Sequence, residues 1–116
     1  MAPQLLYERL DAIERELLQL AQANLFGESL DGQILATIHI SLAADLPGLI
    51  SRLEKKLTWD GYHLTLNYLD LFERRIAVYN VDNAMFGHKY RAFEFHTREL
   101  FADVIAVYTQ NGFGKS

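Results

Sequence analysis

Apolar residues recur at alternating spacings of four and three near the start of the chain, and this pattern constrains the fold more than any other. They are Leu6, Leu10, Ile13, Leu17 and Leu20. The spacing predicts an amphipathic α-helix over residues 4–24, within an N-terminal helical segment 1–26. Leu5 and Leu18 widen the apolar stripe beyond a coiled-coil seam. The helix should therefore pack on a β-sheet in preference to forming a two-stranded coil, and its stripe also offers a homodimer contact.

Residues 33–42, QILATIHISL, alternate apolar and polar side chains and predict a β-strand. One face would carry Ile34, Ala36, Ile38, Ile40 and Leu42. A second helix should follow over residues 46–57, capped by Asp45 and with Pro47 in its first turn.

Two further segments, 61–69 and 75–81, also alternate and predict an antiparallel hairpin joined by the short connection DLFER. Phe93 and Phe95 alternate with polar neighbours, which favours a fourth strand over residues 88–96.

The final segment allows two interpretations. The preferred one has Thr97 capping a last helix that stops at Asn111 and Gly112. The alternative is one long helix, because no helix-breaking residue stands between His88 and Gln110. It is supported by helical spacing of Phe86, Tyr90, Phe93, Thr97, Leu100 and Val104.

The predicted order of elements is thus α-β-α-β-β-β-α. This order predicts an α+β fold, a two-layer sandwich with a four-stranded, mostly antiparallel sheet on which the helices pack. At 116 residues, half of them hydrophobic, the chain is expected to form one domain, 1–116, with 112–116 as a frayed tail.

Composition excludes several classes of site. The chain has no cysteine, so disulfides, thiolate zinc sites and cysteine nucleophiles are ruled out, and a cytoplasmic location is expected. No signal-peptide pattern or run of bilayer length is apparent, so no membrane contact is predicted. The net charge of −4 argues against nonspecific nucleic-acid binding. No cofactor is expected.

The histidines carry the main chemical prediction. In the strand interpretation His39, His63, His88 and His96 all lie on the sheet face turned away from the apolar core. Imidazole binds metals and transfers protons near neutral pH, so His39, His63 and His96 form a weak candidate metal site. No carboxylate stands at a recognised ligand spacing, which favours no metal.

The stretch HKYRAFEFHTRE, residues 88–99, supplies the candidate catalytic residues. On the same strand face His88, Tyr90, Glu94 and His96 could perform general acid/base chemistry. Tyrosine, histidine and arginine, which are common at protein-binding surfaces, also occur on or near this face. The candidate partner- or ligand-binding residues are His63, Thr65, Arg75, Tyr79, Asp82, Asn83, Lys89 and Arg91.

Arg91 and His96 have the spacing of arginine, four residues and histidine that is found in the all-helical HEPN ribonucleases. The predicted strands argue against that fold. In a strand, moreover, the odd separation would send the two side chains to opposite faces.

Three short segments resemble the TumE-type toxins of bacterial toxin-antitoxin modules: AVYNVDNA, GHKYRAFEF and TRELFADV. The similarity covers about residues 76–104. The chain departs from the family pattern in having Val81 before Asp82 and Asn83. The resemblance carries over to Asp82, Asn83, His88, Lys89 and Tyr90, and implies a protein that acts on RNA and is neutralised by an antitoxin.

No catalytic set is complete, which favours a binding protein over an enzyme. The predicted function is a small non-catalytic protein-binding module of the immunity, antitoxin or accessory-factor type, acting through an acidic surface that bears tyrosine and histidine. One alternative is a TumE-like protein acting on RNA, the only case in which nucleic acid is an expected partner. The other is a small-molecule or metal-binding enzyme using the three histidines.

Overall fold

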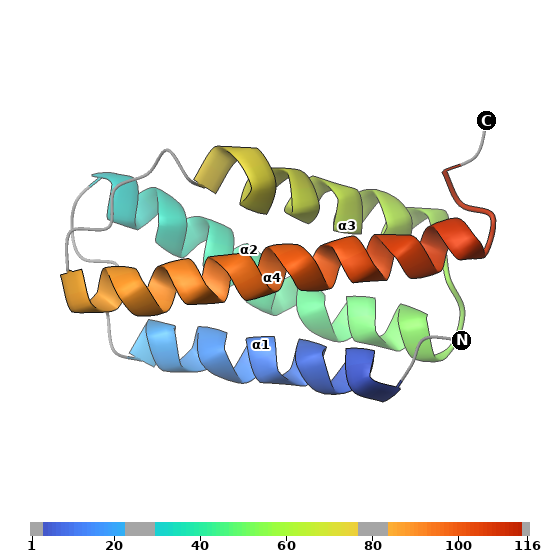
Figure 1. Cartoon of the computed structure of the whole chain (residues 1–116), viewed down its shortest axis with the longest axis horizontal. Coiled ribbons are helices and arrows are strands. Elements are labelled where there is room, and N and C mark those ends of the chain that lie inside the picture. The colour runs from blue at the N-terminus through green and yellow to red at the C-terminus, as the bar shows by residue number, and fades with distance from the viewer. Residues whose placement is uncertain (1–3, 23–29, 77–83, 115–116) are drawn as a thin grey trace.

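The chain forms four long helices and one π-helical turn, as a computed structural model describes for residues 4–22, 30–76 and 84–114. The helices lie side by side along the 42 Å long axis, and successive helices run in opposite directions (Figure 1). The predicted α+β sandwich is therefore wrong, because no strand occurs within these described ranges.

Helix α1 (Gln4–Gln22) confirms the N-terminal helix. Leu6, Leu10, Ile13 and Leu17 are all buried, and α1 packs against both α2 and α4. The hydroxyl of Tyr7 also donates to the carbonyl of Leu53 at the end of α2, at 3.1 Å. The apolar stripe of α1 is therefore used inside the bundle.

Helix α2 (Leu30–Glu54) replaces the predicted strand 33–42, and it confirms the predicted helix 46–57 only as its own C-terminal part, up to residue 54. Its buried side chains recur at helical spacings of four and three, namely Leu35, His39, Leu42, Leu46, Leu49 and Leu53. Asp45 lies inside the helix instead of capping it, and its carboxylate accepts a 2.6 Å hydrogen bond from the Tyr68 hydroxyl. Pro47, predicted in a first turn, also lies in the helix interior.

Helix α3 (Trp59–Asp70) replaces the predicted strand 61–69. Thr58 caps it, because its hydroxyl accepts a 3.0 Å hydrogen bond from the Gly61 amide. Gly61 is buried where α3 approaches α4, and an added Cβ there would collide with the Tyr108 hydroxyl. The close approach of the two helices therefore requires glycine at this position.

The predicted hairpin connection DLFER, residues 70–74, is instead helical throughout. Leu71–Arg75 form a π-helical turn, η1, in which the Ile76 amide donates to the Leu71 carbonyl. Phe72 and Ile76 are both fully buried. Of the predicted strand 75–81, only residues 75 and 76 are described, and they are not extended.

Helix α4 (Ala84–Gln110) confirms the alternative of one long helix. The predicted strand 88–96 is wrong, and Thr97 is fully buried in the middle of α4 instead of capping a helix. The predicted stop is confirmed, because Gly112 adopts a φ of +95° and its amide donates to the Thr109 carbonyl at 3.1 Å. Phe113 then packs on Tyr108, with ring centroids 5.1 Å apart.

Candidate functional site

The described histidines do not share a face. His39 is buried in the bundle core, whereas His63 on α3 and His96 on α4 are exposed. No group of three histidine, aspartate or glutamate side chains within the described ranges is placed to hold a metal ion. The candidate metal site of His39, His63 and His96 is therefore not formed.

His39 has an aromatic environment. Its ring centroid lies 5.4 Å from that of Tyr90, 5.5 Å from that of Phe93 and 5.9 Å from that of Phe72. Nδ1 lies 2.6 Å from the Leu35 carbonyl, which can only accept, so the neutral ring carries its proton on Nδ1. Burial lowers the pKa of His39 to about 4, outweighing the opposing effect of that hydrogen bond. This imidazole is a neutral core residue at physiological pH.

The candidate catalytic residues also separate. Tyr90 and Glu94 are buried, whereas His96 is exposed, because a helix turns these positions in different directions. Burial raises the pKa of Tyr90, and the nearby Glu94 carboxylate raises it further. Tyr90 therefore holds its proton at neutral pH. His88 lies in α4, but its side chain is outside the described part of the structure.

Glu94 has a specific electrostatic role. Its carboxylate accepts a 2.6 Å hydrogen bond from the Arg91 guanidinium, and that guanidinium also lies 5.6 Å from the centre of the Tyr90 ring. A buried carboxylate is stable only when it is paired, so Arg91 neutralises Glu94 at the edge of the core.

The predicted binding residues are scattered as well. His63 is exposed beside Trp59, but Thr65 is buried and its hydroxyl donates to the Gly61 carbonyl at 2.7 Å. Arg75 pairs with Asp70, whose pKa is lowered chiefly by the hydrogen bond from Arg74. Tyr79, Asp82 and Asn83 lie outside the described residues, and so does the side chain of Lys89. The prediction depended on a sheet face shared by tyrosine and histidine side chains, and residues 4–22, 30–76 and 84–114 form no sheet.

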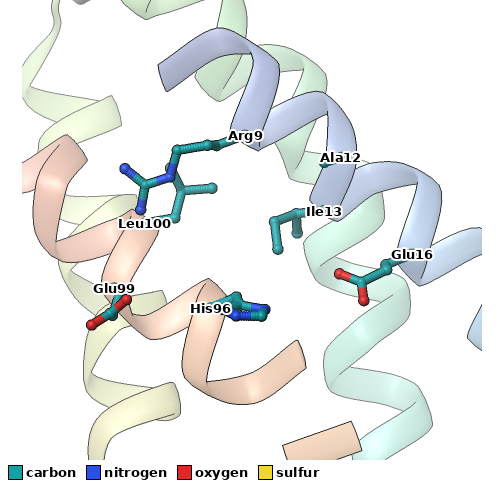
Figure 2. Close-up of a pocket in the computed structure, with 7 residues that line it drawn as sticks. All are labelled: Arg9, Ala12, Ile13, Glu16, His96, Glu99 and Leu100. Atoms are coloured by element: carbon teal, nitrogen blue, oxygen red, sulfur yellow. The ribbon is translucent and has the colours of Figure 1, made fainter. Parts of the chain in front are cut away.

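An open groove of about 470 Å³ lies between α1 and α4. It is lined by Arg9, Ala12, Ile13, Glu16, His96, Glu99 and Leu100. Figure 2 shows the His96 ring turned toward Glu16 across the groove, while Glu99 points away from both. Arg9 at its edge is held by Asp103 of α4, at 2.6 Å. His96 is thus the one predicted catalytic residue whose described side chain lines this groove.

The most unusual surface is one that the sequence patterns did not identify, the outward face of α2. We define it by the exposed residues Leu30, Gln33, Thr37, Ile40, Ser41, Ala44 and Pro47. Leu30 is 72% exposed and Ile40 is 68% exposed. No Asp, Glu, Lys or Arg occurs between Asp31 and Asp45. Helix α2 is therefore apolar on its core side and uncharged along most of its outer side.

An apolar cleft of about 270 Å³ borders this face, between α2 and α3. It is lined by Thr37, Ile38, Ser41, Leu64, Asn67, Tyr68 and Leu71. By length and composition α2 could also cross a membrane, and it is the only helix in the described ranges that could. The sequence had predicted a strand and a separate helix here, so a single 25-residue helix was not expected.

Comparison with protein-family models, with curated proteins and with solved structures finds no match.

Proposed function

We propose that this protein is a non-catalytic protein-binding module whose partner docks on the outward face of α2. The observation that carries the proposal is the uncharged outer side of a helix whose inner side already forms the core. The outer side of a surface helix normally carries charged residues, whereas this one carries Gln33, Thr37 and Ser41 between the exposed side chains of Leu30 and Ile40. Exposed apolar surface of this kind marks interaction sites.

A protein partner suits this face better than a membrane surface does. Helices that lie on membranes carry lysine and arginine on their polar face, which attract anionic headgroups. Helix α2 carries only one such residue, Arg52 in its last turn, so it offers little attraction to lipid charge. Ile40 and Leu30 instead provide apolar anchors, and burial of each side chain would contribute roughly 1.5–3 kcal/mol at full transfer from water.

Replacing Ile40 with lysine tests this proposal. Protein expressed in its native cells should capture a stoichiometric partner, and Ile40→Lys should reduce that capture by about 100-fold because it places a charge in an apolar contact. The readout is quantitative pull-down followed by mass spectrometry. Leu18→Lys is the matched control, since Leu18 is a half-exposed apolar residue on α1. Equal losses in both variants would contradict a site on α2.

A second candidate function, cleavage of RNA, is favoured by the helical placement of Arg91 and His96. The all-helical bundle removes the objection that arose from the predicted strands. Both residues lie on the exposed side of α4 and flank Phe95, over whose ring the Arg98 guanidinium stacks at 5.1 Å. Aromatic and arginine side chains together are suited to an unpaired base and its phosphate.

The chemistry would follow from these side chains. His96 would take the proton of a ribose 2′-hydroxyl as its oxygen attacks the adjacent phosphorus, and Arg91 would stabilise charge on the attacked phosphate. A 2′,3′-cyclic phosphate would form as the P–O5′ bond breaks, and the leaving 5′-oxygen would take up a proton from water. The two positions are about 140° apart around the helix axis, so the substrate would lie across Phe95. Arg91 would have to hold the phosphate with the N–H groups that Glu94 does not use, since the two side chains are paired at 2.6 Å and Glu94 is buried.

RNA cleavage without added metal tests this second function. The full chain should cleave single-stranded RNA in the presence of a chelator, and expression of the chain should arrest growth. His96→Ala should lower the rate by about 10²- to 10⁴-fold, the usual loss on removing a general base. His63→Ala is the matched control, because His63 is also exposed but lies on α3. Absence of cleavage by the unaltered protein would exclude this function.

A further inference from the structure

We infer that the groove between α1 and α4 binds a small organic cation, an amine with an apolar body, whose ammonium group lies between Glu16 and His96. The two side chains belong to opposite walls of the groove, Glu16 to α1 and His96 to α4. Figure 2 shows the His96 ring turned toward the Glu16 carboxylate across the open space. This site is separate from the outward face of α2, so it does not depend on the proposed function.

The groove has the size and the floor of a small-molecule site. Its volume of about 470 Å³ lies within the range of roughly 300–1,000 Å³ that is usual for ligand sites, which often form between the helices of a bundle. Ile13 and Leu100 line it and are only 4% and 1% exposed, so they form its floor. Ala12 is exposed and adds a methyl group at the rim. The apolar body of a ligand would contact these three side chains.

The charges of the lining residues select a cation. Arg9, at the edge of the groove, is neutralised by Asp103 at 2.6 Å. Glu16 and Glu99 also line the groove, and neither forms an ion pair with another residue of the described ranges. A ligand that carries a carboxylate or a phosphate would therefore be repelled, whereas an ammonium group would supply the missing positive charge.

Hydrogen-bonding capacity favours an ammonium group in particular. It has three N–H donors and no acceptor, whereas the Glu16 carboxylate can only accept and a neutral His96 ring accepts at one nitrogen. The hydrogen bond to Glu16 would join two ionised groups, which makes it stronger than one between neutral groups. Glu99 points away from this pair in Figure 2, so it would attract the cation without contacting it.

A metal ion fits the groove less well than an organic cation does. No group of three histidine, aspartate or glutamate side chains in the described part of the chain is arranged to hold a metal. An amine needs fewer polar contacts, because its apolar body supplies the rest of the binding energy by burial against the floor.

The cleft between α2 and α3 provides an internal reference. It is also lined largely by apolar side chains, but none of the residues that line it is charged. A compound that enters any apolar recess should occupy both sites, whereas a compound selected by charge should prefer the groove between α1 and α4.

An NMR titration of the full chain tests the inference, with phenethylammonium as the probe and phenylacetate as the matched compound of opposite charge. Phenethylammonium should shift the amide signals of residues on both walls along one saturation curve, namely Ile13, Glu16, His96 and Leu100. It should bind about tenfold more tightly than phenylacetate. Glu16→Gln keeps the shape of the side chain but removes its charge, and should weaken phenethylammonium binding by about tenfold. Glu14→Gln is the matched control and should bind normally, because Glu14 is a half-buried glutamate of α1 that does not line the groove.

Charge reversal gives a second test of the same site. Glu16→Lys should reverse the selectivity, so that phenylacetate binds more tightly than phenethylammonium. Each of four results would overturn the inference: no saturable shift, equal binding of the two compounds, equal losses in Glu14→Gln and Glu16→Gln, or shifts confined to Leu64 and Asn67 of the cleft between α2 and α3. None of them bears on the capture of a partner by α2, so the inference and the proposed function can fail separately. Circular dichroism of each variant establishes that the helices remain folded.

Discussion

Gly61→Ala is expected to lower the free energy of unfolding by about 3 kcal/mol, at the upper end of the cost of overpacking a core. An added Cβ would collide with the Tyr108 hydroxyl and would lie only 2.7 Å from Cδ of Arg52. Tyr108 is fully buried and cannot swing aside without moving α4. Urea unfolding followed by circular dichroism measures the change.

Two further variants separate this collision from a general effect of substitution in α3. Asn67→Ala also introduces alanine into the same helix, but at an exposed position, so it should leave stability unchanged or raise it slightly. Tyr108→Phe removes the hydroxyl that meets the new methyl group, so the double variant should recover about 1 kcal/mol relative to the additive expectation. Strict additivity would mean that Tyr108 is not the obstacle.

His39→Leu is expected to abolish a large part of the acid sensitivity of the fold. The folded pKa of His39 is lowered to about 4 from an ordinary value of 6.5, so the unfolded chain binds a proton that the folded chain excludes. Stability should therefore be complete above about pH 6.5 and fall as the pH drops toward 4. The shift corresponds to a loss of about 3 kcal/mol across this window.

The measurement is the free energy of unfolding at several pH values between 7 and 4, compared between the unaltered chain and His39→Leu. Carboxylates such as Asp70 titrate in both proteins, so their contribution cancels in the difference. His63→Gln should keep the full dependence, because it leaves the buried ring in place. An unchanged slope in His39→Leu would contradict the assignment of this titration to His39.

Sequence periodicity predicted the helices whose apolar side chains lie on one side. In α1 the buried leucines recur at helical spacing against a polar face, so that helix was recognised. In α2, Ile40 is an apolar residue on the exposed side of the helix. Because of it, apolar and polar residues alternate over residues 33–42 as they would in a strand. The error and the candidate binding face thus have the same origin, which is apolar surface that the folded monomer leaves exposed.

Helix α3 was missed for a different reason. Two of its buried positions are Gly61 and Thr65, neither of which counts as apolar in a search for a hydrophobic face. Gly61 leaves room for the Tyr108 hydroxyl, and the Thr65 hydroxyl donates a hydrogen bond to the Gly61 carbonyl. When small or polar residues occupy the buried positions of a helix, the helical spacing of its apolar residues is therefore not visible in the sequence. In α4 the aromatic spacing was visible, but Phe93 and Phe95 also fitted a strand, and only the long-helix alternative was correct.

The π-helical turn η1 accommodates one residue more than an ordinary helix would need over the same stretch. On an ordinary helix, the buried positions of this segment would move gradually around the helix axis, because their mean spacing exceeds 3.6 residues. These positions are Gly61, Thr65, Tyr68, Phe72 and Ile76. The wider turn at Leu71–Arg75 takes up that drift and returns Ile76 to the core. Such turns are in effect single-residue insertions absorbed by a helix. Deletion of one residue within η1 would shorten this segment to ordinary helical phase, so this stretch of the bundle is where a sequence of slightly different length could retain the same fold.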